Sequence, residues 1–348
     1  MRRIRWNKVF RLILILISVV LILYIGRSWL PGIGKQKVGH IIRPPHEVSA
    51  LAVHGNTLFA GGQEGVFIID RRTGSVKSRL GEGEGFEYVK SLLVDQNGVL
   101  WIAHQRGLTS YDGQRFTNFT AKDGLPDNRV NCIYQDNQDR LWVGTWGGAA
   151  CLENTGWKII DHREGLLVDM VNVIMEDSRG GMWFGSYAVR RGGVSYYNGS
   201  EWSYLTTQNR KLPDPNISDI FEDNNGQILI ASGFVDQGGL IKIKLQDKQI
   251  KQHSVITRKD GLAGEKVRSI FQEPSGTLWI ASEYDGVARI SKQGTIDIYT
   301  TQNGLSGNEV KDWIRDDTGN LWMATDNGIT LIRSDELERL YRAKGAIL

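Results

Sequence analysis

The pentapeptide Gly98-Val99-Leu100-Trp101-Ile102 recurs, with small changes, along most of this 348-residue chain. Further copies keep the tryptophan at Trp142, Trp183, Trp279 and Trp322, and two degenerate copies, at 56–60 and 227–231, lack it. The tryptophans are separated by 41, 41, 96 and 43 residues, and the longest interval contains a copy without tryptophan. A period of about 40–50 residues built from short strands is typical of a β-propeller. Seven copies therefore predict an all-β fold with seven blades.

One repeat, residues 130–170, shows how a blade forms. Short alternating segments rich in β-branched and aromatic residues predict strands, at Val130–Tyr134, Leu141–Thr145, Ala149–Glu153 and Trp157–Asp161. The polar segment 135–139 predicts a turn in which Asp and Asn side chains bond the backbone. Trp142 is large enough to fill the wedge between two blades. Applied to every copy, this pattern places blades at 47–88, 89–129, 130–170, 171–216, 217–266, 267–309 and 310–334.

The last blade needs an outer strand from elsewhere, because its repeat ends early. Residues 38–45 include the apolar segment Val38-Gly39-His40-Ile41-Ile42 and are expected to close the ring. A short terminal helix is predicted over 335–344, where Leu337, Leu340 and Tyr341 recur at helical spacing.

A second repeated element, Asp-Gly-Leu or Asn-Gly-Leu, links one blade to the next. It stands at 123–125, 260–262 and 303–305, and a variant, Glu164-Gly165-Leu166, follows the third blade. Glycine is expected where the backbone needs a positive φ, and the leucine is expected to fill the gap beneath the crossing. These positions are predicted to be architectural.

Charge is distributed unevenly. Of 42 Lys and Arg residues, nine lie within 1–46, whereas all 39 Asp and Glu residues follow residue 46. The overall charge of +3 is thus a property of the N-terminal segment, and the repeats themselves are acidic. A nucleic-acid-binding domain should carry a basic face, so the composition argues against nucleic acid as a partner.

The N-terminal segment predicts a membrane anchor. A basic stub, 1–11, precedes fourteen apolar or small residues, 12–25, and the stretch 9–30 is long enough to span a bilayer. Basic residues stay on the cytoplasmic side, so we expect a single-pass protein with a cytoplasmic N-terminus, a tether at 31–37 and an extracytoplasmic propeller at 38–348. A cleaved signal peptide is the alternative.

The repeats also resemble a known family. Asp95-x-x-Gly98-x-Leu100-Trp101-Ile102, then Gly107-Leu108, Tyr111-Asp112-Gly113 and 123–128 (Asp-Gly-Leu-Pro-Asp-Asn), is similar to the two-component regulator propeller repeat. The resemblance implies a seven-bladed propeller of the kind found in extracytoplasmic sensor regions of hybrid histidine kinases, where such domains recognise glycans or other ligands. The printed sequence has no kinase or response-regulator pattern after Trp322, so we expect no phosphotransfer by it.

Candidate binding residues come from the loops between second and third strands, which share one face with the blade crossings and surround one mouth of the channel. These loops are short except in blades four and five, at 186–193 and 232–239. An aromatic and arginine group suits stacking and bidentate bonding of a glycan or an organic anion. The candidates from these two loops are Tyr187, Arg190, Arg191, Phe234, Asp236 and Gln237, joined by His104, Trp146 and Tyr284 from equivalent positions.

Other functions remain open as alternatives. Six histidines lack metal-binding spacing, and no nucleotide-binding or nucleophile motif occurs, so no metal, cofactor or enzymatic activity is expected. A propeller lyase or hydrolase with His104 as its base is the alternative from another class. A cell-envelope scaffold that binds a protein partner is a third. Cys132 and Cys151, in the first and third strands of one blade, could be free or paired.

Overall fold

The computed structural model describes residues 37–188, 190–209 and 211–345, with the side chains of 252 and 342–345 excepted. The predicted membrane anchor, stub and tether therefore lie outside the described residues, apart from Lys37. Within the described part of the chain, no helix is both long and apolar enough to cross a bilayer.

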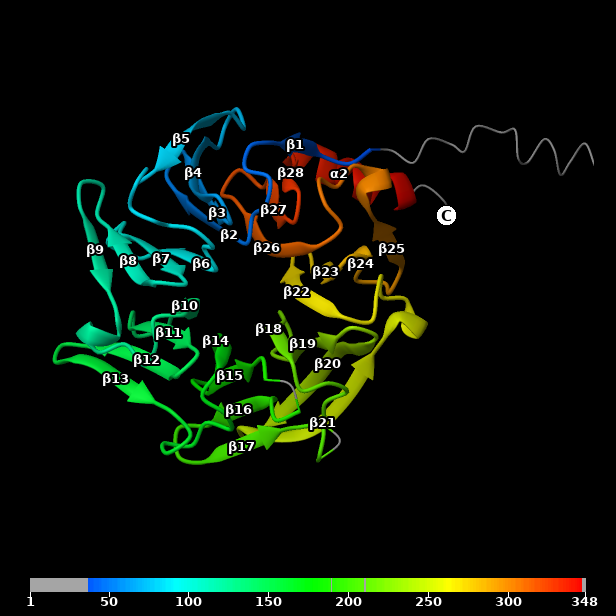
Figure 1. The fold of residues 1–348 in the computed structure, drawn as a ribbon. Coiled ribbons are helices and arrows are strands. Elements are labelled where there is room, and N and C mark those ends of the chain that lie inside the picture. Colours follow the sequence, from blue (N-terminus) through cyan, green and yellow to red (C-terminus); the bar gives the residue numbers. More distant parts are fainter. Residues whose placement is uncertain (1–36, 189, 210, 346–348) are drawn as a thin grey trace, which may run out of the picture. The chain divides into compact units, whose positions relative to one another are not determined.

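The described residues form seven four-stranded antiparallel sheets arranged as blades around a central channel (Figure 1). Blades one to three contain β2 (Ala50–His54), β3 (Thr57–Gly62), β4 (Gly65–Asp70), β5 (Val76–Leu80); β6 (Ser91–Val94), β7 (Leu100–His104), β8 (Gly107–Tyr111), β9 (Phe116–Phe119); and β10 (Val130–Gln135), β11 (Leu141–Thr145), β12 (Gly148–Glu153), β13 (Gly156–Ile160). Blades four and five contain β14 (Val171–Glu176), β15 (Met182–Ser186), β16 (Val194–Tyr197), β17 (Trp202–Leu205); and β18 (Ile217–Glu222), β19 (Ile228–Phe234), β20 (Gln237–Gln246), β21 (Gln249–Ile256). Blades six and seven contain β22 (Val267–Gln272), β23 (Leu278–Ser282), β24 (Gly286–Ile290), β25 (Ile296–Tyr299); and β26 (Val310–Arg315), β27 (Leu321–Thr325), β28 (Gly328–Ile332). The predicted seven-bladed fold is confirmed.

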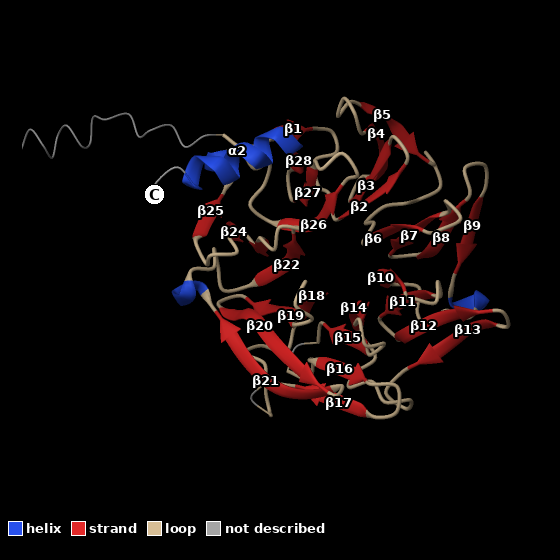
Figure 2. Cartoon of the chain, turned by 180° about the vertical axis from the view of Figure 1, so that it is seen from behind, coloured by secondary structure: helices blue, strands red, loops and turns tan. Residues whose placement is uncertain are grey.

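The seventh blade is completed from the N-terminal side of the propeller. Strand β1 (His40–Ile42) pairs antiparallel with β28 as its outermost strand, and His40 lies opposite Leu331. The segment that follows is held by Arg43, whose Nε donates to the carbonyl of Asn327 at 2.7 Å. Helix α2 (Ser334–Gly345) packs beside this blade (Figure 2), which confirms the short C-terminal helix. Residues distant in sequence thus fasten the ring.

The core lies between blades. Trp183, Trp279 and Trp322 are fully buried. Each belongs to a hydrophobic cluster that joins neighbouring sheets. Trp322 of blade seven, for example, packs with Leu58 and Ile69 of blade one. The prediction that tryptophan fills the wedge is therefore confirmed for these blades.

In the five blades that have a repeat tryptophan, a carboxylate joins the turn before the second strand to that tryptophan. Asp177, which precedes the turn between β14 and β15, accepts bonds from the backbone N–H groups of Arg179 and Gly181 at 2.9 and 3.0 Å. Its other oxygen accepts from Trp183 Nε1 at 2.8 Å. Equivalent bonds join the carboxylates and tryptophans of blades two, three, six and seven. One carboxylate thus sets both the turn and the orientation of the wedge side chain.

The crossings between blades follow the predicted chemistry. Short 3₁₀ turns η1 (Ala121–Asp123), η2 (Arg258–Asp260) and η3 (Thr301–Asn303) each end at a left-handed glycine, with φ of 102° at Gly124. The leucine that follows is buried in every case, at Leu125, Leu262 and Leu305. The architectural role expected of these positions is confirmed.

Candidate functional site

One mouth of the central channel is a concave region lined by charged, polar and aromatic side chains. A cavity of about 410 Å³ opens there, with Lys90, Arg129 and Arg268 as its cations and Trp146 and Tyr187 as its aromatic wall. A second cavity of about 430 Å³ continues into the channel, lined by the innermost strands of all seven blades. The mouth therefore combines charge, amide groups and aromatic surface, the usual components of a small-ligand site.

Register shifts in the innermost strands shape this mouth. Strands β10, β14, β18, β22 and β26 each skip one residue in pairing with the next strand. The skipped residues are Asn131, Asn172, Ser218, Arg268 and Lys311. Four of them line the channel, and Asn131 lines the mouth cavity. A bulge of this kind re-aims a side chain, so these positions deliver polar groups to the mouth.

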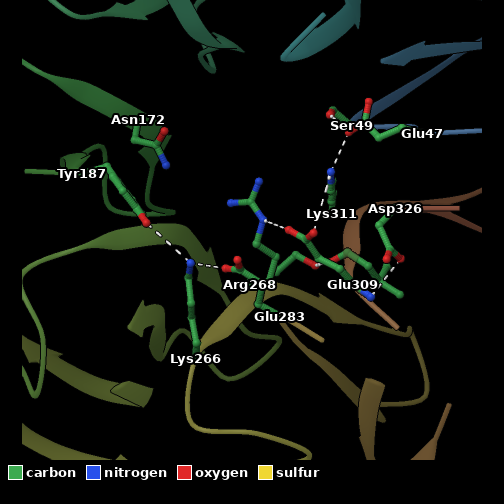
Figure 3. Close-up of polar contacts among 12 residues, drawn as sticks. Glu47, Ser49, Asn172, Tyr187, Lys266, Arg268, Glu283, Glu309, Lys311 and Asp326 are labelled. Atoms are coloured by element: carbon green, nitrogen blue, oxygen red, sulfur yellow. Dashed lines mark hydrogen bonds and ion pairs between the residues drawn. The ribbon is translucent and has the colours of Figure 1, made fainter. Parts of the chain in front are cut away.

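Most charges at the mouth are paired (Figure 3). Arg268 Nε donates to Glu309 at 3.1 Å. Lys311 Nζ lies 2.5 Å from Glu47 and 3.8 Å from Glu309. Burial acts to raise the pKa of Glu47, but bonding and attraction to Lys311 outweigh it and lower that pKa. These ion pairs link blades one, six and seven.

Lys90, just before β6, differs from the other cations. Within the part of the chain that the structure describes, its ammonium forms no hydrogen bond or ion pair. Partial removal from bulk water, together with repulsion by Arg268 and Lys311, lowers its pKa. Lys90 is therefore the cation at the mouth whose charge is least compensated.

Two of the predicted residues of blades four and five, Tyr187 and Phe234, pack against each other. The rings of Tyr187 and Phe234 meet edge to face with centroids 6.5 Å apart. Lys266 Nζ lies 5.8 Å from both ring centres and pairs with Glu283. Tyr284 is 71% exposed, and its hydrogen bond to Glu283 raises the pKa of its hydroxyl to about 12.

Trp146 is held in place at the edge of the mouth cavity. The Arg129 guanidinium stacks 4.2 Å from its ring centre, and its Nε1 donates to Asn131 Oδ1 at 3.3 Å. Arg129 is fixed in turn by Asp127. Trp146 is nonetheless 44% exposed, so it presents a rigid aromatic surface.

The remaining predicted residues lie apart from the cavity. Arg190, Arg191, Asp236 and Gln237 are exposed and do not line it. The segment 232–239, predicted to be a long loop, is instead an extension of the β19–β20 hairpin, in which Phe234 pairs with Gln237. Antiparallel backbone pairing continues through the glycines of this segment, so the strands extend where the composition suggested a loop.

His104 is a correction to the predicted ring of binding residues. It is only 5% exposed. Its Nε2 lies 3.0 Å from Thr109 Oγ1, and its Nδ1 accepts from the backbone N–H of Arg106. Burial and the nearby Arg106 charge lower its pKa to about 4. His104 is thus a neutral core residue whose two ring nitrogens already have partners.

Asp161, His162 and Asp169 do not line the mouth cavity, and neither cysteine does, although Cys132 lines the channel cavity. Asp161, His162 and Asp169 bring ligand atoms within 4.8 Å of one another. Asp161 is already bound by Arg163, and His162 Nδ1 lies 2.8 Å from Asp169.

Cys132 and Cys151 are free thiols on β10 and β12, with β11 between them. Burial raises the pKa of Cys132 to about 12 and that of Cys151 to about 11, so neither is a reactive thiolate.

Sequence reasoning missed the polar residues that line the mouth and channel cavities, and Lys266, which contacts Tyr187. The lining residues are Lys90, Arg129, Asn131, Asn172, Arg268 and Lys311. A signal was present, because most of them stand just before or at the second residue of an innermost strand. Using this signal requires knowing which residue each innermost strand skips in its pairing. The alternation of apolar and polar side chains does not reveal that residue.

Comparison with known proteins supports this fold. Residues 124–147 and 165–188 match the two-component regulator propeller. No curated protein matches the sequence. The extracellular domain of the hybrid two-component system BT3049 from B. thetaiotaomicron has 18% sequence identity and a TM-score of 0.75, covering 87% of this chain and 42% of that one. The present chain therefore spans about two fifths of the length of that domain.

Other solved propellers match this chain with comparably low sequence identity. Virginiamycin B lyase from Staphylococcus aureus has 13% identity and a TM-score of 0.63, covering 85% of this chain and 98% of that one. PorZ, a surface component of the type-IX secretion system of Porphyromonas gingivalis, has 16% identity and a TM-score of 0.63, covering 83% and 47%. At these identities the matches establish the fold alone. The chain is thus a seven-bladed β-propeller, two segments of which, 124–147 and 165–188, match the two-component regulator propeller.

Proposed function

We propose that this protein is an extracytoplasmic, membrane-anchored binding module, similar to the sensor regions of two-component systems, which takes a glycan or a small organic anion at the mouth of its channel. The observation that carries the proposal is the mouth cavity, where Lys90 lacks an ion-pair partner and Trp146 presents a fixed aromatic surface. The cavity volume of about 410 Å³ falls within the range of small-molecule sites.

The test is ligand-induced thermal stabilisation of the purified full chain in mild detergent, screened against neutral oligosaccharides, sugar acids and organic acids. A ligand that binds only the native state raises its stability by mass action. We expect at least one class to raise the melting temperature. Trp146→Ala and Tyr187→Ala should abolish the increase, whereas Tyr204→Ala, on the outer strand β17, should keep it. An increase unaffected by both mouth variants would refute the location.

A protein partner is the second candidate, favoured by exposed apolar groups on the same face. Tyr284, Val235 and Phe234 are 71%, 66% and 41% exposed at the hairpin ends of two neighbouring blades. Exposed groups of this type are common at protein interfaces. Photo-cross-linking from position 284 in intact cells would detect such a partner, and loss of the cross-link on Val235→Asp would assign it to this surface.

Catalysis by His104 is not proposed. The side chain is buried, and both of its ring nitrogens contact other groups of the protein. Turnover of a candidate substrate that is lost on His104→Ala, with the fold intact, would overturn this assignment.

The membrane anchor is proposed from the sequence of residues 9–30. Full-length protein should stay in the membrane fraction after alkaline carbonate extraction, and the propeller should be open to protease from the outer side only. Release by carbonate would refute an uncleaved anchor.

A further inference from the structure

The arrangement of charges around Lys90 restricts what the mouth can bind. Three cations, Lys90, Arg268 and Lys311, stand near two carboxylates, Glu47 and Glu309. Both carboxylates are already engaged, Glu47 by Lys311 and Glu309 by Arg268 and Lys311. Among the described residues, Lys90 is therefore the member of this group whose charged head has no hydrogen bond or ion pair.

Arg268 supplies free donors beside Lys90. Its Nε bonds Glu309, whereas its two Nη nitrogens form no hydrogen bond among the described residues (Figure 3). Arg268 and Lys90 line the same cavity and lie close enough to repel each other. An acceptor between the Nη edge and the ammonium would relieve this repulsion, because charge-assisted hydrogen bonds to both groups would form.

The neighbouring acids set the charge of that acceptor. A single negative charge is enough to pair the Lys90 ammonium. A dianion, such as a phosphate monoester, would add a second negative charge near Glu47 and Glu309, where part of the space is removed from water and repulsion is weakly screened. The aromatic wall of the cavity determines the other part of the ligand. Trp146, which Arg129 and Asn131 hold in place, offers a flat surface against which a ring can lie.

Resting on the proposed small-ligand function, we propose that the mouth is specific for a monocarboxylate carried on a ring, with the carboxylate between Lys90 and Arg268 and the ring against Trp146. The ring belongs either to a sugar acid or to a non-sugar organic acid. Lys90 is then the residue that distinguishes the acid from its neutral parent.

The test uses matched probes on the full chain, titrated by calorimetry at pH 7: glucuronate with glucose, benzoate with benzyl alcohol, and glucose 6-phosphate as the dianion. We expect at least one carboxylate to bind about tenfold or more tightly than its neutral parent, and glucose 6-phosphate to bind more weakly than that carboxylate. One charge-assisted bond is worth about that factor. Binding by glucuronate but not benzoate identifies the sugar acid, and the reverse identifies the non-sugar acid.

Variants assign the effect. Lys90→Met, which keeps the aliphatic stem, should weaken carboxylate binding about tenfold or more and leave the neutral parent unchanged. Lys292→Met, in the turn between β24 and β25, is the matched control and should change neither. Trp146→Ala should weaken acid and neutral parent alike.

Each remaining outcome counts against the inference. Equal binding of acid and neutral parent, lost on Trp146→Ala, would overturn carboxylate specificity and leave the proposed function standing. Tighter binding of glucose 6-phosphate would overturn the charge argument. No binding by any probe would overturn both the specificity and the small-ligand function.

Discussion

Replacing Asp177 by alanine tests the bond that couples turn and wedge in each blade. Asp177 and Trp183 are both fully buried. The substitution leaves two buried donors, Gly181 N–H and Trp183 Nε1–H, without an acceptor. Each buried unsatisfied donor costs about 1–3 kcal/mol, so the variant should lose about 3–5 kcal/mol of unfolding free energy.

Blade two provides the internal comparison. Asp95 makes the same bonds to its turn and to Trp101, but the backbone donors and the indole are partly accessible to water. Asp95→Ala should therefore cost only about 1–2 kcal/mol, since water replaces part of the lost bonding. The loss of unfolding free energy for Asp177→Asn should lie between these two values, because the asparagine amide keeps one acceptor but presents N–H groups on the other side.

Thermal unfolding of the full chain, followed by circular dichroism, measures these losses. For a body of this size about 1 kcal/mol corresponds to roughly 2 °C. We expect the melting temperature to fall by about 6–10 °C for Asp177→Ala and about 2–4 °C for Asp95→Ala. Equal decreases, or a decrease below about 2 °C for Asp177→Ala, would refute the claim that buried bonding to the carboxylate holds the blade.

The remaining predictions concern pH, a core histidine and ring closure. Burial raises the pKa of Asp219 to about 6 and that of Asp312 to about 7 in the channel. Raised carboxyl pKa values mean that these groups stabilise the fold most below about pH 4 and that this contribution is lost as pH rises through 6 and 7. Melting curves from pH 4 to 8 should therefore be flatter for Asp219→Asn and Asp312→Asn than for wild type, and unchanged slopes would contradict the assignment. The contribution of His104 to stability has the opposite pH dependence. Because its pKa is about 4, this contribution is present above about pH 6.5 and is lost as the pH falls towards 4. His104→Ala should lower the melting temperature at pH 7 by several degrees yet leave probe binding within about twofold, and a loss of binding without a loss of stability would return His104 to the site. Deletion of 38–45 removes β1 and its pairing with β28, together with buried Val38 and Ile42, at a cost of about 5 kcal/mol. The melting temperature should fall by roughly 10 °C, and an unchanged value would show that the ring does not depend on this strand.

Much of the fold could be predicted because its determinants are local and repeated. Trp183 marks a second strand, and Gly124 marks a crossing where the backbone must adopt a positive φ. Each signal is carried by a few adjacent residues, and seven copies reinforce it. The closing segment 38–45 could also be proposed, since only one short apolar stretch was available to the seventh blade.

The candidate site was predicted less well, for two physical reasons. Loop length pointed to 232–239, but backbone pairing continued there as a hairpin and moved Asp236 and Gln237 away from the cavity. His104 occupies a loop-adjacent position, yet its orientation follows from Thr109 and Phe86, which the repeat pattern does not specify. Tyr187 and Trp146 do line the cavity, because each is the first residue after a second strand that ends at the mouth.

By itself the sequence determined the architecture: seven blades, wedge tryptophans, left-handed crossings and an acidic propeller behind a basic N-terminal segment. Only the tertiary structure decided which side chains meet at the mouth. Lys90 and Arg268 are 178 positions apart in sequence, and they share a cavity because closure of the ring brings blades two and six around one axis. A repeat fixes the distance between neighbours along the chain, whereas a binding site is formed by groups that face one another across the channel.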